Sequence, residues 1–135
     1  MKRCVIPALL AAALTLVPGD GLVAQRRGET HRLHKVFDDA WQFEKDEAPT
    51  FATSVGDHRH DDRLSSNRVE DYKRRELVRE EFIKRIDRID RKQLSERDQV
   101  NLDIFARLQR DELSELKFKT YLMPITNRGG FHVWF

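Results

Sequence analysis

Apolar side chains recur every three or four residues through three long stretches of this 135-residue chain, and this spacing is what most constrains its fold. The spacing matches the 3.6-residue turn of an α-helix, so each stretch gathers its apolar side chains on one face. Charged residues make up 36% of the sequence and fill the positions between, which suits solvated helix surfaces. Strand signals are almost absent. The pattern predicts an all-α protein with three long amphipathic helices and one short helix.

The first predicted helix runs from about Thr30 to Asp46, with Thr30 as its N-cap. Its apolar face contains Leu33, Val36, Phe37, Ala40, Trp41 and Phe43. Trp41 is expected to pack in the core. Glu44 falls in the middle of the same face. Pro49 ends the helix, because the residue before a proline avoids helical geometry.

The segment from Pro49 to Leu64, PTFATSVGDHRHDDRL, is the most specific stretch of the chain. A short helical turn is expected from Pro49 to Ser54, with the proline at its first position. Gly56 suits the positive φ that follows a helix end. The residues from Asp57 to Ser65 have no apolar period and predict an ordered loop.

The second predicted helix runs from about Asn67 to Asp90, with Ser65 or Ser66 as its cap. Its apolar stripe contains Val69, Tyr72, Val78, Phe82, Ile83, Ile86 and Ile89, and excludes Leu77. On the other face, acidic residues stand four positions before basic ones, in the pairs Glu70–Arg74, Asp71–Arg75, Glu80–Lys84, Glu81–Arg85 and Asp87–Arg91. Each such pair stabilises a helix by about 0.2–0.5 kcal/mol. The pairing favours a solvated, self-paired face over an RNA- or membrane-binding helix.

The third predicted helix begins at a capping box formed by Ser95 and Asp98 and runs to about Leu116. Ile104, Phe105, Leu108, Leu113 and Leu116 are expected to face the core, and Asn101 and Glu112 fall on the same face. Residues 117–122 (KFKTYL) alternate polar and apolar and could be extended. The chain ends on the apolar cluster FHVWF, which needs a partner surface, so we expect the front part of a longer protein.

The N-terminus has the layout of a secretory signal peptide over residues 1–24. A basic start is followed by an apolar run from Val5 to Val17 and then by Pro18 and Gly19. The run is shorter than the roughly 20 residues that span a bilayer. An uncleaved anchor is the alternative, but the short run and its flanks favour cleavage, so we expect a secreted or periplasmic chain. Cleavage also removes Cys4, the single cysteine.

Charge excludes some classes of partner. Without residues 1–24, the basic residues fall from 25 to 23 and the acidic ones from 23 to 22, so the net charge is near +1. Such a balance supplies no long-range field for nucleic acid or anionic lipid. We therefore expect neither nucleic acid nor, after cleavage, a membrane as a partner.

Three motifs in a fixed order carry a resemblance to a known family. They are PTFATSVGDHRHDDRLS at 49–65, LSERDQVNLDIFARLQRDELSELKF at 94–118 and YLMPITNRGGFH at 121–132. Behind a signal peptide, they resemble the N-terminal region of the bacterial family known as domain of unknown function 885, over about residues 33–135. The resemblance implies a secreted, mostly helical, gluzincin-type zinc peptidase or hydrolase of several hundred residues. In such proteins a later His-Glu-x-x-x-x-His motif implies water activation on zinc, with the glutamate as general base.

That zinc motif does not occur in this chain. Its histidines are His31, His34, His58, His60 and His132, and none is followed by a glutamate. The resemblance therefore assigns no catalytic, cofactor-binding or metal-binding residue here. Zinc is expected only in the full-length parent protein.

The candidate site residues lie in a loop and near the C-terminal end. They are Asp57, His58, Arg59, Asp61, Asp62 and Arg63, with Gly129, Gly130 and His132. The loop has metal-ligand residue types but no evident distant ligand, so we prefer a structural loop or the lining of a substrate channel. In the structural interpretation, Asp57 bonds loop amides, and Arg59 or Arg63 pairs with Asp61 or Asp62. His31 and His34 could share a metal, but a lone pair at this spacing is weak evidence, and we prefer exposed histidines near a helix start.

Glu44, Asn101 and Glu112 are polar residues on apolar helix faces. A buried, unpaired carboxylate costs several kcal/mol or has a raised pKa. We expect these side chains to pair with one another, with Arg107 or with loop amides. The functional alternative is an acid that faces substrate or supports a site.

These observations lead to one expectation about function. Residues 25–135 form the N-terminal helical segment of a longer domain, an incomplete bundle without catalytic residues. It packs against the missing C-terminal catalytic part of a secreted zinc-dependent peptidase and helps to wall the cavity that holds a peptide substrate. The alternatives are a stand-alone periplasmic module that binds a partner, and a gene fragment without a function of its own.

Overall fold

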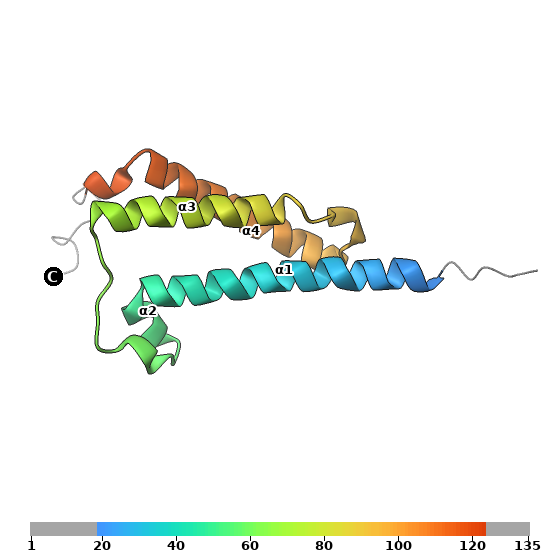
Figure 1. Cartoon of the computed structure of the whole chain (residues 1–135), viewed down its shortest axis with the longest axis horizontal. Coiled ribbons are helices and arrows are strands. Elements are labelled where there is room, and N and C mark those ends of the chain that lie inside the picture. The colour runs from blue at the N-terminus through green and yellow to red at the C-terminus, as the bar shows by residue number, and fades with distance from the viewer. Residues whose placement is uncertain (1–18, 124–135) are drawn as a thin grey trace, which may run out of the picture.

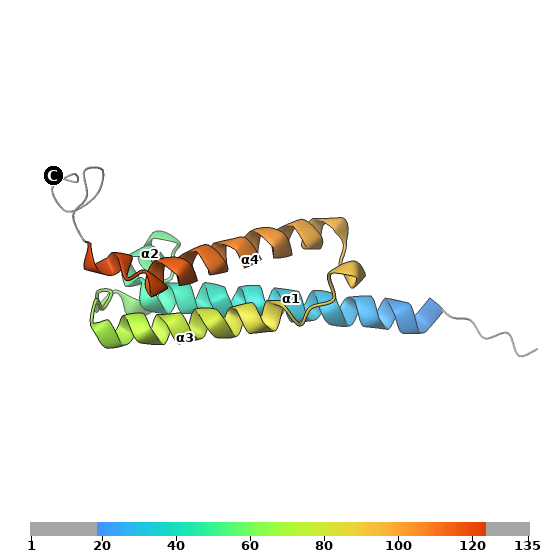
Figure 2. The same cartoon turned by 90° about the horizontal axis from the view of Figure 1, so that it is seen from above.

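The computed structural model describes residues 19–123 and confirms the predicted all-α class. Its helices are α1 (Gly19–Glu47), α2 (Pro49–Ser54), α3 (Val69–Ile86) and α4 (Glu96–Lys117), with short 3₁₀ helices at His58–His60, Arg91–Gln93 and Thr120–Leu122. No strand occurs in this range. In both views α3 runs back along α1 and α4 returns along α3, while α2 folds over the C-terminal end of α1 (Figures 1 and 2).

The apolar core lies among the three long helices and the connection from α3 to α4. Its buried side chains are Leu33, Val36 and Ala40 of α1, Phe82 and Ile86 of α3, Ile89 and Leu94 of the connection, and Leu102 and Ala106 of α4. Two aromatic pairs extend it. The Phe37 and Phe105 rings are 5.0 Å apart between centroids, and the Phe43 and Phe82 rings are 5.9 Å apart. Each long helix thus contributes one apolar face to the core.

Helix α1 begins at Gly19 instead of near Thr30. No proline lies within residues 19–47, so nothing in the backbone stops the helix at the predicted N-cap. Residues 23–28 are exposed, and Glu29, which follows them, is buried. Among residues 19–123, no helix has the length and apolar content needed to cross a bilayer. Residues 1–18 of the predicted signal peptide lie outside the described residues.

The turn after α1 follows its sequence signals. Pro49 occupies the start of α2, and the helix ends at Ser54, as predicted. Gly56 has a φ of +85°, which confirms the predicted left-handed position. The following loop is ordered by the short 3₁₀ helix at His58–His60.

Helix α3 is shorter at both ends than predicted. Its N-cap is Arg68, without a side-chain hydrogen bond, so the predicted caps Ser65 and Ser66 are wrong. The Ser66 hydroxyl donates instead to the Asp71 carboxylate at 2.5 Å. At the other end the helix stops at Ile86, and a turn carries Ile89 into the core.

Helix α4 begins as predicted, because the Ser95 side chain accepts a hydrogen bond from the Asp98 amide at 3.1 Å. Its predicted core face is partly wrong. Leu102, Ala106 and Gln109 are buried, whereas Ile104 and Leu108 are exposed. Packing of the 102–106–109 side against the core decides this rotation.

The predicted extended segment at residues 117–122 is also wrong. The amides of Phe118 and Lys119 continue helical bonding to the carbonyls of Ser114 and Leu116, at 2.9 and 3.0 Å. Lys119 then turns with a φ of 55°, and a 3₁₀ helix follows. The segment therefore forms local helical hydrogen bonds, although its alternating polar and apolar residues suggested an extended strand.

Ion pairs join the helices to one another. None of the five predicted intrahelical pairs of the second helix is present in the described part of the chain. Six of their members pair between elements instead, as Glu47–Arg74 (2.6 Å), Glu47–Arg75 (2.7 Å), Asp39–Arg85 (2.7 Å), Glu80–Lys117 (3.0 Å), Asp87–Arg110 (2.7 Å) and Arg91–Asp103 (2.8 Å), while Asp71 pairs within α3 with Arg74 at 3.3 Å. The charged face of α3 is therefore not only a solvent-facing surface. Its ion pairs also fix the positions of α1 and α4 relative to α3.

Candidate functional site

An exposed apolar stripe runs along α4. Val100, Ile104 and Leu108 lie four residues apart, on one side of the helix. Their side chains are 55%, 55% and 53% exposed. Isolated exposed apolar residues are ordinary, but an aligned set on one helix is typical of a contact surface. We name these three residues the α4 stripe.

The α4 stripe exists because α4 carries more apolar residues than one face can bury. Leu102 and Ala106 enter the core, and Gln109 is buried beside them. Side chains near the opposite side of the helix then remain in solvent. The sequence pattern alone cannot show which of the two faces of α4 is buried, since apolar residues repeat at helical spacing on both.

A second exposed apolar feature joins α1 and α2. Trp41 and Phe51 meet edge to face, with ring centroids 5.4 Å apart. Trp41 is 45% exposed, so its predicted place in the core is wrong. The physical reason is that Phe37, one turn earlier, packs against Phe105 and fills the contact between α1 and α4. Trp41 lies instead against the short helix α2.

A polar centre joins the three long helices at Arg79. Its guanidinium bonds the Glu44 carboxylate of α1, and on α4 the Gln109 carbonyl at 2.9 Å and the Glu112 carboxylate at 2.6 Å. The Arg79 side chain is only 9% exposed and also lies over the Phe43 ring, 5.4 Å from its centroid. Glu44 and Glu112 are therefore paired, but the predicted partners, which were one another, Arg107 or loop amides, are wrong, because both bind Arg79.

The polar centre contains two carboxylates, Glu44 and Glu112, but only one guanidinium, that of Arg79. Burial raises the pKa of Glu112 above its ordinary value, and the Glu44 and Glu115 carboxylates add to the rise, against the opposing effect of Arg79. Asn101, the third predicted polar residue, is partly exposed and does not join the centre. One arginine thus holds two carboxylates, a geometry that locks helices together.

Asp57 fastens the predicted loop to α1. Its carboxylate accepts from Lys45 Nζ at 2.7 Å and from Arg59 Nε at 2.8 Å, and it caps the 3₁₀ helix through the Arg59 amide. Arg59 also donates to Gln42 at 2.9 Å. The predicted capping role of Asp57 is confirmed, but the predicted pairing of Arg59 with Asp61 or Asp62 is wrong. Asp57 lies nearer and accepts in bidentate fashion.

The histidines of the loop also find carboxylate partners. His58 Nδ1 lies 2.9 Å from Asp61, and His60 Nε2 lies 2.8 Å from Asp46 on α1. The Thr53 hydroxyl donates to Asp61 at 2.5 Å. Arg63 donates to the Asp46 carbonyl at 3.4 Å, so its predicted pairing with Asp61 or Asp62 is wrong. Asp62 makes no side-chain bond with any residue of 19–123. The loop is thus held by α1 and α2.

The electrostatics of the loop favour a folded, charged network. Hydrogen bonds from Arg59, and next from Lys45, hold the pKa of Asp57 far below its ordinary value of 3.8. Hydrogen bonds from Thr53 and then His58 lower the pKa of Asp61. Both carboxylates therefore stay ionised at neutral pH, which suits structural acceptors rather than proton donors.

The described segment contains no cluster of metal-ligand side chains. No group of three or more His, Cys, Asp or Glu side chains within residues 19–123 is arranged to hold a metal ion. His34 contacts Asp98, with Nε2 and Oδ1 3.3 Å apart, whereas His31 lies in a separate cleft. Gly129, Gly130 and His132 lie outside the described residues.

Arg79 and the cleft beside His31 are the features that sequence reasoning missed. A usable signal for Arg79 was its position on the apolar stripe of the second helix, between Val78 and Phe82. Comparison with known proteins adds no relative, since no family model, curated protein or solved structure matches this chain. The candidate surfaces are therefore defined by their own geometry.

Proposed function

We propose that this chain is a non-catalytic helical segment of a larger secreted zinc-peptidase-like protein. Its α4 stripe packs against the catalytic body of the same polypeptide, and the segment helps to wall the cavity that receives a peptide. The α4 stripe is the observation that carries this proposal. The sequence motifs at 49–65, 94–118 and 121–132 supply the class of the parent protein, and zinc belongs to the catalytic body.

Energetics favour a covalently attached occupant for the α4 stripe. Burying a whole aliphatic side chain contributes about 1.5–3 kcal/mol, so covering three half-exposed ones contributes about 3 kcal/mol. A separate partner loses about 4 kcal/mol or more of translational and rotational freedom on binding. A body on the same chain avoids most of that loss, because its effective concentration is high. The catalytic part of the same protein is therefore the best-suited occupant.

The loop at residues 57–63 suits a cavity wall. Lys45, Asp46 and Gln42 of α1 hold it through side-chain bonds, so it presents an ordered rather than an adaptable surface. His58 and Arg59 remain exposed on its outer side. These groups offer hydrogen bonds to a peptide, in keeping with a role that is positional and not catalytic.

The test compares the isolated chain with the protein encoded by the complete reading frame. In the isolated chain, Ile104→Glu changes the free energy of unfolding by no more than about 0.5 kcal/mol, because the site is exposed. In the complete protein the same change buries a charge in the interface and costs about 2 kcal/mol or more. Urea denaturation of both proteins measures the difference.

Leu77→Glu is the matched control. Leu77 is 67% exposed on α3, outside the α4 stripe, and the change has the same chemistry. It should be nearly neutral in both proteins. Equal effects of Ile104→Glu in the two proteins, or equal effects of the two changes in the complete one, would contradict docking through the α4 stripe. A complete reading frame that lacks the His-Glu-x-x-x-x-His motif would contradict the assignment of the parent protein to the zinc peptidases.

The α4 stripe also favours a second candidate, a stand-alone periplasmic module that binds another protein. A stop codon directly after residue 135, with cooperative folding of the purified chain, would support this candidate. Ile104→Glu would then weaken binding of a defined partner, and Leu77→Glu would not.

A further inference from the structure

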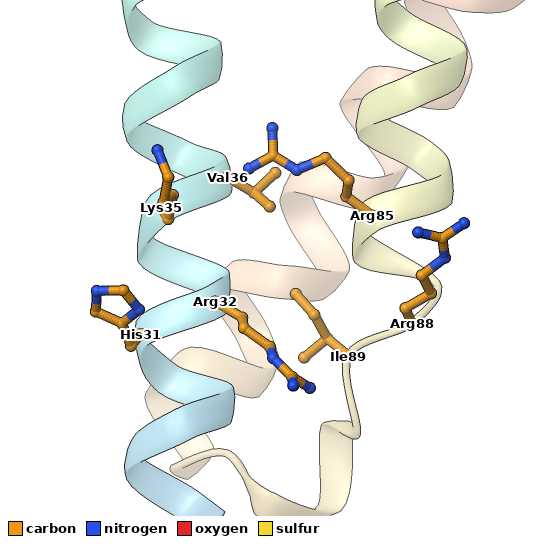
Figure 3. A pocket seen from close by; sticks show the side chains of 7 residues that line it. All are labelled: His31, Arg32, Lys35, Val36, Arg85, Arg88 and Ile89. Carbon is orange, nitrogen blue, oxygen red and sulfur yellow. The ribbon is translucent and has the colours of Figure 1, made fainter.

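A cleft of about 370 Å³ lies between α1 and the C-terminal end of α3. His31, Arg32, Lys35 and Val36 line it from α1, and Arg85, Arg88 and Ile89 line it from α3 and the following turn. Figure 3 shows Val36, Ile89, Arg32 and Arg85 extending into the space between α1 and α3, while His31 lies on the side of α1 away from α3 and Arg88 rises beside the end of α3. It shares no residue with the α4 stripe, so its function is independent of the docking proposed above.

The lining of the cleft is strongly cationic. It contains four permanent cations, Arg32, Lys35, Arg85 and Arg88, and no carboxylate. Two carboxylates pair with lining residues, Glu29 with Arg32 and Asp39 with both Lys35 and Arg85. Four cations against two anions leave an excess of two positive charges. Arg88 has no ion pair within the described residues, and its guanidinium is available to a ligand.

The paired carboxylates hold the cations in position. Asp39 accepts from Lys35 Nζ at 3.0 Å and from Arg85 at 2.7 Å, which ties the two walls together. Glu29 accepts from Arg32 at 2.6 Å and from the Asp90 amide at 3.1 Å, which ties α1 to the turn after α3. The cleft is thus preorganised, and a ligand need not order these side chains afresh.

The cleft also has an apolar floor. Val36 and Ile89 are core residues, 3% and 8% exposed, and they reach the cleft from below the charged rim. A ligand with a short apolar part can cover this floor, while its charged end meets the cations. The volume lies near the lower end of the roughly 300–1,000 Å³ that small-molecule sites occupy.

We infer that this cleft binds a small organic phosphate monoester. A phosphate monoester carries a charge of about −1.5 to −2 at neutral pH, which matches the excess of two, and it offers three acceptor oxygens. Arginine guanidinium groups bind phosphate in bidentate fashion, and Arg85 and Arg88 supply them on one wall. The ester carbon chain lies on Val36 and Ile89. Single carboxylates carry half the charge and fit the cleft less well.

Titration of the full chain with butyl phosphate tests the ligand class. Isothermal calorimetry at low salt should show saturable one-to-one binding, tighter than that of inorganic phosphate, because only the ester covers the apolar floor. Butanol should not bind, because it lacks the charge. Absence of saturable binding, or binding of succinate as tightly as butyl phosphate, would overturn the assignment to phosphate monoesters.

Variants locate the binding. Arg88→Gln removes a cation that makes no ion pair with residues 19–123, so the fold is retained, and we expect affinity to fall roughly tenfold. Arg107→Gln removes the same charge from a side chain that is 83% exposed on α4. It should change affinity less than about twofold, through screening alone. Equal losses in the two variants would show non-specific charge attraction and would sink the site.

Discussion

At the residue scale, Asp57 shows how one carboxylate organises a whole loop. It accepts from a buried lysine of α1, from a neighbouring arginine and from a backbone amide. The sequence motif indicated a capping aspartate, because Asp follows Gly56 at a helix end. It could not indicate Lys45, which lies twelve residues earlier and meets Asp57 only after α2 folds back.

The low pKa of Asp57 makes a pH prediction. Because its folded pKa lies below the ordinary 3.8, the ionised form stabilises the fold above that pH, and this contribution is lost as the pH falls below it. The Asp57→Asn variant lacks the ionisable carboxylate and therefore this pH-dependent contribution to stability. The stability difference between parent and variant should therefore be largest near neutral pH and shrink towards about pH 2.5, as measured by urea denaturation.

Asp62→Asn is the control on the same loop, because Asp62 makes no side-chain bond to the described residues. Its stability should follow that of the parent at every pH. A stability difference for Asp57→Asn that stays constant with pH would show that the carboxylate is not linked to folding through its proton.

At the element scale, α4 shows that helical periodicity identifies an apolar helix without choosing which face is buried. Ile104 and Leu108 repeat at the same spacing as Leu102, Ala106 and Gln109. Contact with α3 and the core selects the second set. Glycines show a similar dependence on context, since Gly28 lies inside α1 and Gly56 lies just after α2 with a φ of +85°.

Replacing these two glycines by alanine should have opposite effects. An added Cβ meets no atom within 4 Å at either position, so backbone preference decides the result. Gly28→Ala should raise the free energy of unfolding by about 0.5–1 kcal/mol, because alanine favours a helix. Gly56→Ala should lower it by about 1–2 kcal/mol, because the left-handed conformation strains a side chain. Urea denaturation measures both, and changes of the same sign would contradict the assigned backbone conformations.

At the scale of the whole molecule, ion pairs between α1 and α3 accompany the packing of the core. Asp39, Glu44 and Glu47 of α1 face Arg85, Arg79 and the Arg74–Arg75 pair of α3, in the order that antiparallel helices require. Exposed pairs of this kind contribute little singly. Arg79 differs because it is buried and serves three helices at once.

Arg79→Met should destabilise the protein by about 2 kcal/mol. Methionine keeps the stem packed on Phe43 but leaves Glu44 and Glu112 without their cation. These carboxylates are 38% and 47% exposed, so the loss stays below the roughly 3–5 kcal/mol of a fully buried pair. Thermal and urea unfolding, followed by circular dichroism, measure it.

Two further variants serve as a control and as a test of coupling for the Arg79→Met prediction. Arg107→Met, at an exposed position, should change stability by no more than about 0.5 kcal/mol. Adding Glu112→Gln to Arg79→Met should recover part of the loss, because one unpaired carboxylate is removed. Strictly additive losses in the double variant would mean that Arg79 and Glu112 do not act together.

The sequence alone determined the all-α class, the helix pattern, the breaks at Pro49 and Gly56 and the cap at Ser95. These features depend on residues within one or two helical turns, where local sterics and hydrogen bonds decide the conformation. Only the tertiary structure decided that Trp41 and the α4 stripe stay exposed, that Arg79 joins three helices, and that a cationic cleft forms between α1 and α3. Each of these features depends on side chains that are far apart in the sequence. Such side chains come into contact only when the helices pack, and the rotation of each helix about its axis decides which of them meet.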